Sequence, residues 1–197
     1  IRTICGVSWR VLQGVLMIIL VSSSVTRAKV LRDHGVKFEQ VFFDYDESGV
    51  DKNLPPHVYV QKIVAAKKEQ FLKANDGAKN VLFADSVVVC DGKILGKAKD
   101  EKEALKMLRM QSGNVARIVT AMIFLGEKLE LINVSFAEYK FAKFDETDLQ
   151  NYLSGDLWQG KAGAMTIENF NKKYITSQHG ETSTAMGLNL KILKAFL

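Results

Sequence analysis

The sequence predicts an α/β protein built on one mixed sheet, in which some neighbouring strands run parallel and others antiparallel. Short apolar runs of strand length alternate along the chain with stretches of helical periodicity, as they do in α/β folds. At two places, however, consecutive strands are joined by turns too short to hold a helix, which makes those pairs antiparallel. The 197 residues, 47% of them hydrophobic and 25% charged, suffice for one domain or for two small lobes that share a core.

Caps and breakers define the elements in the first half of the chain. Ser24 and Gly35 bound one helix, and Pro56 starts another because proline fits the first helical turn. The expected elements are a buried strand at 17–21, a helix at 26–34, a strand at 36–43 that an acidic loop follows, and a helix at 56–74.

The second half is bounded in the same way. Asp91-Gly92 is a hairpin turn inside an apolar stretch, and Asp100 and Asp145 are N-caps of helices that end near Gly113 and Gly155. The expected elements are strands at 81–90 and 93–95, a helix at 101–111, strands at 117–125 and 129–141, a helix after residue 145, an irregular stretch at 160–163, and a last helix from about residue 188.

The N-terminal region has the general pattern of a signal peptide, since two arginines precede an apolar stretch at 11–21 that small residues follow. Gln13-Gly14 interrupts that stretch, and Met17 is a plausible start for a chain whose first residue is Ile. We therefore expect residues 1–16 to be an extension outside the fold and residues 17–197 to form a single domain. No run reaches the roughly 20 apolar residues of a membrane span, so no membrane partner is expected.

Composition argues against two classes of protein. The net charge of +5 includes Arg2 and Arg10, and the rest is mild and scattered, so nucleic-acid binding is not indicated. An anionic small molecule such as a nucleotide is compatible with this charge. Two cysteines and three histidines lie far apart in sequence and predict no zinc site, only buried or incidental thiols in a reducing compartment.

Asp85 is the most informative single residue. It stands inside the apolar run 81–90, where an unpaired carboxylate costs desolvation energy. Two interpretations remain open. Either the side chain hydrogen-bonds to nearby amides at a strand bulge, or it points into a cleft as a general base or metal ligand.

Hydroxyl side chains and one arginine separate the first strand from the first helix. Ser22, Ser24, Thr26 and Arg27 would offer hydroxyls, a guanidinium and the helix N–H groups to a phosphate. The alternative is a plain capped helix with Arg27 on its solvent face.

Three further charged residues gain a role only if the fold brings them to Asp85. Glu47, in the acidic loop, would become a magnesium ligand, and Lys67 and Lys97 would become phosphate partners instead of surface lysines. The run 92–98 is similar to a phosphate-binding loop, but it has three spacer residues where that motif needs four, so it does not predict a nucleotide site by itself.

Taken together, these motifs resemble the Maf family, the septum-formation proteins that act as nucleoside triphosphate pyrophosphatases. Residues 22–27 (Ser-Ser-Ser-Val-Thr-Arg) stand where the family has Ser-x-Ser-Pro-Arg-Arg, and 84–86 (Ala-Asp-Ser) stand at its Ala-Asp-Thr core motif. The other matches, in the family's order, are Gly-Lys-Ala-Lys-Asp at 96–100, Ser-Gly at 112–113, Lys-Ala-Gly-Ala at 161–164 and Gly-Leu at 187–188. The similarity runs from about Met17 to the end of the chain.

The resemblance implies an elongated mixed α/β sheet with flanking helices and two lobes around a central cleft. It implies a cytoplasmic enzyme, often a homodimer, that uses Mg²⁺ or Mn²⁺ to hydrolyse a nucleoside triphosphate between the α and β phosphates. Such enzymes prevent the incorporation of aberrant nucleotides, with a link to cell-division arrest. The implied roles are proton acceptor for Asp85, metal binding for Glu47 and Asp85, phosphate binding for Ser22, Ser24, Arg27, Lys67 and Lys97, and substrate specificity for Thr26, Ser86 and Glu168.

Several positions depart from the family pattern. Val25 replaces the loop proline, Thr26 the first of two arginines, and Ala116 a histidine, and Lys97 is followed by alanine instead of proline. Glu168 replaces a glutamine that helps to select pyrimidines, and an ionised carboxylate donates no hydrogen bond to a base. We expect dTTP and UTP as substrates first and modified nucleotides next. The alternative is a catalytically weak nucleotide sensor or division regulator that uses the same cleft.

Overall fold

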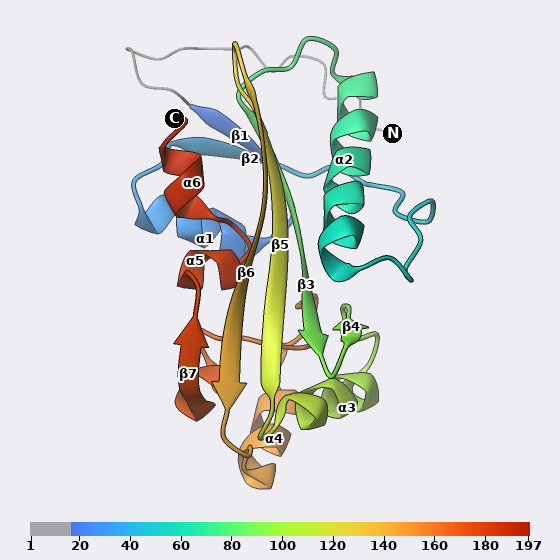
Figure 1. Ribbon diagram of the computed structural model, residues 1–197, viewed down its shortest axis with the longest axis vertical. Coiled ribbons are helices and arrows are strands. Elements are labelled where there is room, and N and C mark those ends of the chain that lie inside the picture. The colour runs from blue at the N-terminus through green and yellow to red at the C-terminus, as the bar shows by residue number, and fades with distance from the viewer. Residues whose placement is uncertain (1–16) are drawn as a thin grey trace.

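A narrow mixed sheet of seven strands runs the length of the molecule (Figure 1). The strands are β1 (Ile18–Val21), β2 (Phe38–Val41), β3 (Val81–Cys90), β4 (Lys93–Leu95), β5 (Val115–Leu125), β6 (Glu130–Phe141) and β7 (Ile175–His179). Their spatial order is β2-β1-β3-β5-β6-β7, with β4 paired to β3. β1 pairs in parallel with β2 and β3, and the other pairs are antiparallel, which confirms the predicted mixed α/β sheet.

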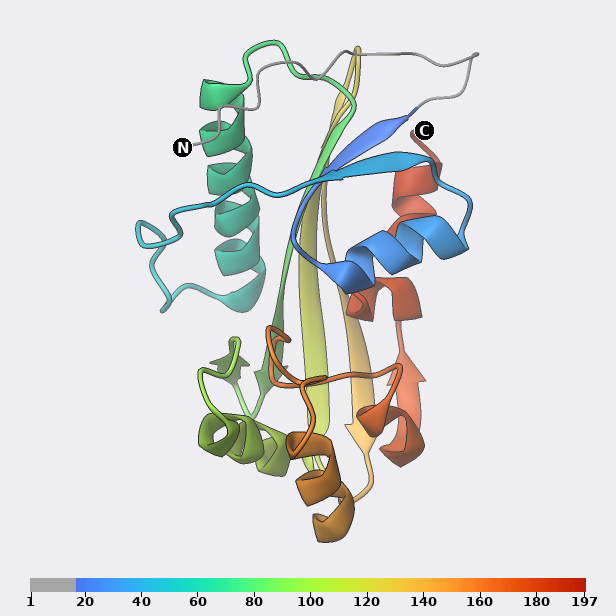
Figure 2. The same cartoon turned by 180° about the vertical axis from the view of Figure 1, so that it is seen from behind.

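Helices flank this sheet on both faces and at one end (Figures 1 and 2). They are α1 (Val25–Asp33), α2 (Pro56–Ala74), α3 (Glu101–Gln111), α4 (Glu146–Leu153), α5 (Thr182–Ala185), α6 (Leu190–Lys194) and the 3₁₀ helix η1 (Phe170–Tyr174). The computed structural model describes residues 17–197, and the expectation for residues 1–16 concerns residues outside that range. None of the helices it describes has the length and apolar content needed to cross a bilayer.

Alternate side chains of β3 point to opposite faces of the sheet, and different helices cover each face. On one face Phe83 and Val87 pack with buried residues of α2. On the other face α1 and α6 form a core around Leu82 at one end of the strand, while α3 and α4 form a second core around Val88 at the other end. This face therefore carries two lobes.

The sheet is polar and incompletely paired between these two lobes. Ser86 and Thr120, cross-strand neighbours on β3 and β5, share a hydrogen bond of 2.8 Å there instead of packing into either core. Along the outer edge of β3, the pairing with β1 stops at Leu82 and the pairing with β4 begins at Val88. In the described chain, the stretch 83–87 therefore has a strand neighbour on one side only.

The predicted caps and turns are confirmed. The side chains of Ser24, Asp100 and Asp145 each accept a hydrogen bond from the first turn of their helix, and the hairpin residues Asp91 and Gly92 have φ of 48° and 71°. The sequence did not predict η1, β7 or α5. The strand β7 (Ile-Thr-Ser-Gln-His) is mostly exposed and lacks apolar alternation, so no periodicity marks it as a strand.

Gly163 holds the loop that closes the α3–α4 lobe against β3. Its N–H donates to the Gly96 carbonyl at 2.8 Å, and its own carbonyl accepts from the buried Gln111 amide at 2.7 Å. The φ of Gly163 is +64°, and a Cβ at this position would lie 3.0 Å from Cβ of Val88. Glycine is required here by both the backbone conformation and the close approach.

We expect Gly163→Ala to lower the free energy of unfolding by about 2–5 kcal/mol, because left-handed strain of about 1–2 kcal/mol adds to overpacking of about 1–3 kcal/mol. Gly160→Ala is the matched control, since its φ is +69° but no atom lies within 4 Å of the added Cβ. This control should show the strain alone. Urea unfolding of both variants measures the difference, and equal losses would contradict a role for the contact with Val88.

Candidate active site

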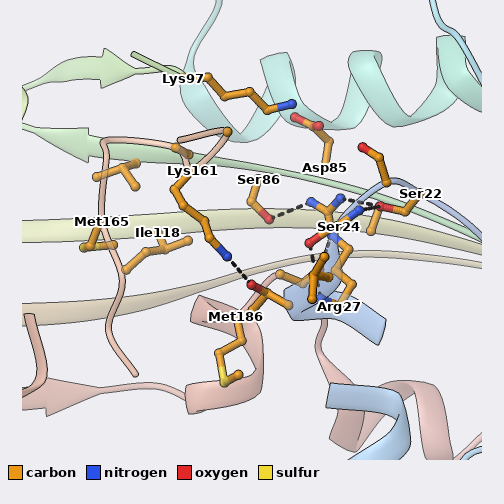
Figure 3. A pocket seen from close by; sticks show the side chains of 18 of the residues that line it. Ser22, Ser24, Arg27, Asp85, Ser86, Lys97, Ile118, Lys161, Met165 and Met186 are labelled. Carbon is orange, nitrogen blue, oxygen red and sulfur yellow. Dashed lines mark hydrogen bonds between the residues drawn. The ribbon is translucent and has the colours of Figure 1, made fainter. Parts of the chain in front are cut away.

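The open edge of β3 borders a pocket of about 480 Å³ between the lobes, which we call the inner pocket (Figure 3). Its lining comes from the β1–α1 loop and the start of α1, the acidic loop, α2, β3, β5, the segment around residues 159–168, the turn after α5 and Lys97, which follows β4. All ten residues that the sequence singled out line it, although they lie far apart in the chain: Ser22, Ser24, Thr26, Arg27, Glu47, Lys67, Asp85, Ser86, Lys97 and Glu168.

Arg27 points inward from the first turn of α1, so the alternative that placed it on the solvent face is wrong. Its guanidinium donates to Ser22 Oγ at 3.1 Å, to Ser86 Oγ at 3.3 Å and to the Gly187 carbonyl at 3.1 Å. All three acceptors are neutral. Burial lowers the pKa of Arg27, and the negative charge of Asp85 opposes part of that shift. An anion in the pocket would therefore find a partly buried cation that no carboxylate within residues 17–197 neutralises directly.

Asp85 lies beside Lys67 and Glu47. Lys67 Nζ, on α2, is 2.7 Å from Asp85 Oδ1 and 2.7 Å from Glu47 Oε1, and its side chain is only 11% exposed. The register of β3 with β5 runs unbroken through Asp85 and Ala121, so the bulge interpretation is wrong. The carboxylate is instead held at the open sheet edge by an ammonium group and faces the pocket.

The two carboxylates fit a divalent cation bound jointly by protein and phosphate. Mg²⁺ is commonly held in proteins by one or two carboxylates together with substrate phosphates and water, not by a full set of protein ligands. Glu47 and Asp85, which meet at the same ammonium group, match that donor set. Within residues 17–197 no group of three or more histidine, cysteine, aspartate or glutamate side chains gathers as a dedicated metal site.

Tyr45 connects this cluster to the phosphate loop. Its ring centroid is 5.4 Å from Lys67 Nζ, a cation–π distance, and its hydroxyl donates to the Val21 carbonyl at 3.3 Å. Burial raises the pKa of Tyr45 far above its ordinary value, so the hydroxyl stays protonated as a donor. One side chain thus contacts both the cation beside Asp85 and the strand end that precedes Ser22.

Two more cations line the inner pocket. Lys161 Nζ donates to the hydroxyl of Thr26. Lys97 lies on the opposite side of the pocket from Lys161, next to Asp85 (Figure 3). Within residues 17–197 neither lysine has a carboxylate oxygen within 4.0 Å. Lys161 therefore places a positive charge against the residue where the family pattern has an arginine.

The lining of the inner pocket also includes apolar side chains and one further acid. Ile118, Met165 and Met186 contribute apolar side chains to the pocket (Figure 3). Glu168 also lines the pocket. Ser86 does not face a ligand freely, because its hydroxyl is engaged by Arg27 and Thr120. Apolar side chains with one hydrogen-bonding group suit a nucleobase next to phosphate-binding cations.

Comparison with known proteins agrees with these features. A family model described as Maf-like protein matches residues 17–197. The chain belongs to the Maf-like family. Relatives named nucleoside triphosphate pyrophosphatase include one from Campylobacter jejuni subsp. jejuni (strain 81116), 46% identical over 184 residues that cover 92% of this chain and 100% of the relative. Others come from a Nitratiruptor species, 44% identical with coverage of 90% and 96%, and Helicobacter pylori (strain J99), 36% identical with coverage of 88% and 91%.

The geometry of this Maf-like protein adds site residues that sequence reasoning missed. Lys161 had a signal, since it opens the Lys-Ala-Gly-Ala motif, but only the fold places it against Thr26. Tyr45 had none, because an aromatic residue in an acidic loop does not indicate which side chain it will contact. Ile118 and Met165 are apolar residues that a sequence assigns to the core before it assigns them to a pocket wall.

We expect the contact between Tyr45 and Lys67 to be visible by NMR. An ammonium group over a ring face is shielded by the ring current, so the Lys67 side-chain signal should lie upfield of the other lysines. Tyr45→Phe keeps the ring and should keep that shift, whereas Tyr45→Leu should abolish it and lose about 0.5–2 kcal/mol of cation–π attraction.

Tyr59→Leu is the control for this measurement, since Tyr59 lies on α2 like Lys67 but makes no cation–π contact with it among the described residues. It should leave the Lys67 signal in place. If Tyr45→Leu leaves it in place as well, Tyr45 does not position Lys67.

Proposed function

We propose that this protein hydrolyses a nucleoside triphosphate between the α and β phosphates, releasing the monophosphate and pyrophosphate. The observation that carries the proposal is that one pocket holds both Arg27, whose guanidinium donates to neutral oxygens among the described residues, and the cluster of Asp85, Lys67 and Glu47. The first is suited to bind phosphate, and the second to activate water. The relatives from Campylobacter, Nitratiruptor and Helicobacter are named nucleoside triphosphate pyrophosphatase, which supports this proposal.

The proposed mechanism is in-line attack of water on the α phosphorus. Asp85 accepts the proton from the water, and Lys67 orients its carboxylate. Ser22, Ser24 and Arg27 bind phosphate oxygens at the N-terminus of α1. Lys97 offsets the negative charge that develops on the departing pyrophosphate oxygen.

Glu47 and Asp85 are the proposed ligands of a divalent cation, Mg²⁺ or Mn²⁺. When bound there, it would neutralise phosphate charge and make the phosphorus more electrophilic. Lys67 positions both carboxylates, because its ammonium group pairs with each of them and offsets the repulsion between their negative charges.

Substrate choice is proposed to depend on Thr26, Ser86 and Glu168. Thr26 acts by positioning Lys161, and Ser86 by positioning Arg27, while Glu168, which lines the same pocket, contacts the base. dTTP, UTP and modified nucleotides are the proposed substrates. We further propose that the protein acts in the cytoplasm as a homodimer. There it would remove aberrant nucleotides, with a link to division arrest.

The second candidate is a nucleotide sensor with little turnover. It is favoured by Thr26, which supplies no charge of its own where the resemblance leads us to expect an arginine. It is opposed by Asp85, Lys67 and Glu47, because a sensor has no need for a carboxylate placed to activate water.

The test is pyrophosphate release from a panel of standard and modified nucleoside triphosphates, with Mg²⁺ or Mn²⁺. We expect release from one or a few of them. Asp85→Asn keeps the shape and removes the base, so turnover should fall at least a hundredfold, within the roughly 10²–10⁴-fold typical of general-base catalysis. Glu181→Gln, an exposed acid outside the pocket, is the control.

Three results would count against this assignment. Nucleotide binding without release would favour the sensor, and full turnover in Asp85→Asn would remove Asp85 as the base. If no nucleotide binds, the cleft has another ligand.

We expect Glu168→Gln to change base preference. An ionised carboxylate only accepts hydrogen bonds and so favours a base that presents an amino group, whereas glutamine can also donate to a carbonyl such as O4 of thymine or uracil. The ratio of kcat/KM for dTTP or UTP to that for CTP should therefore rise roughly tenfold, as one base-edge hydrogen bond of about 1–3 kcal/mol allows. An unchanged ratio would mean that Glu168 does not contact the base.

A further inference from the structure

A second and larger pocket, of about 960 Å³, opens on the other side of Asp85, and we call it the outer pocket. The loop before α2, the first turn of α2 and the β3–β4 hairpin enclose it. It shares Glu47, Asp85, Ser86 and Lys97 with the inner pocket. The two pockets are therefore neighbouring compartments that meet at the proposed catalytic carboxylates.

The outer pocket attracts anions. Lys52, Lys93 and Lys97 line it, and within residues 17–197 none of them has a carboxylate oxygen within 4.0 Å. The two acids on its border, Glu47 and Asp85, are already engaged by Lys67. An occupant with negative charge close to Asp85 would therefore meet more unpaired cations than anions.

The same pocket is also apolar, which a bare phosphate does not require. Leu54, Pro55, Pro56, Tyr59 and Ile94 contribute to its wall. A hydrated pyrophosphate gains nothing from such surface, whereas an organic group gains from burial and a flat base gains from contact with an aromatic ring. The lining therefore suits an occupant that carries phosphate at one end and an apolar or aromatic group at the other.

The direction in which a substrate would lie follows from the proposed function, on which this inference rests. The base lies against the apolar side chains and Glu168 in the inner pocket, and the α phosphate lies at the sheet edge beside Asp85. The β and γ phosphates then extend away from the nucleoside, toward the outer pocket. A pyrophosphate would fill only the part of the outer pocket next to Lys97 and leave the wall formed by Tyr59 and Ile94 uncovered.

We propose that the outer pocket accepts a second nucleoside esterified to the terminal phosphate, so that this protein also cleaves dinucleoside polyphosphates. Water attacks the α phosphorus and forms the new P–O bond, and its proton goes to Asp85. The bond from the α phosphorus to the bridging oxygen breaks, and its electron pair leaves with the β phosphate. A dinucleoside triphosphate therefore gives one nucleoside monophosphate and one nucleoside diphosphate, and a tetraphosphate gives a monophosphate and a triphosphate.

The experiment compares the best-cleaved nucleoside triphosphate with the symmetric dinucleoside triphosphate and tetraphosphate that carry the same base, using the full chain and separating products by chromatography. We expect kcat/KM for the dinucleotides within about tenfold of that for the triphosphate. Tyr59→Leu should lower the dinucleotide value roughly tenfold, the scale of one lost base–aromatic stack, and leave the triphosphate value unchanged. Leu54→Ser, in the exposed loop, is the second variant should Tyr59→Leu fold poorly.

The outcomes separate the two proposals. Cleavage of the triphosphate without cleavage of either dinucleotide overturns this inference and leaves the proposed function standing. Cleavage of neither class overturns both. If the dinucleotides are cleaved but neither variant affects them selectively, the second nucleoside does not occupy the outer pocket and the inference is wrong.

Discussion

Within residues 17–197 the outer edge of β3 has no strand partner between Leu82 and Val88, and the position of the cleft depends on this gap. β1 pairs with one end of the strand and β4 with the other, so two lobes form on the same sheet without closing over its middle. An unpaired edge usually invites aggregation, and charged side chains at the edge oppose it. Here the edge carries Asp85, so the carboxylate that we propose as the catalytic base also protects the sheet from pairing with another chain.

Strand geometry divides the chemistry of the cleft between the two faces of the sheet. Neighbouring residues of a strand point to opposite faces, so Asp85 meets α2 and Lys67 on one face while Ser86 meets Arg27 and Thr120 on the other. A one-residue shift in the register of β3 would exchange these environments. The unbroken β3–β5 ladder is therefore as important to the site as the residues themselves, because it fixes which face receives the proposed base and which receives the arginine proposed to bind phosphate.

Much of this arrangement could be predicted from the sequence, and the remainder depends on contacts between distant segments. The mixed sheet, the capping by Ser24 and the informative position of Asp85 follow from local pattern, because caps, turns and apolar runs are properties of adjacent residues. β7 could not be predicted, since it is a polar strand stabilised by pairing with β6. The contact between Lys161 and Thr26 joins residues 135 positions apart, and no spacing rule encodes it.

The charge of the cleft supports the proposal that a triphosphate binds here together with a divalent cation. The inner pocket is lined by four cationic side chains and four acidic ones: Arg27, Lys67, Lys97 and Lys161, with Asp44, Glu47, Asp85 and Glu168. The formal charge of this lining is therefore close to zero, although the whole chain carries +5. A triphosphate brings about four negative charges, which the protein alone does not balance. If Glu47 and Asp85 bind a cation, Lys67 loses part of their negative charge. The substrate phosphates that arrive with the cation can then pair with Lys67, so its buried ammonium group keeps an anionic partner.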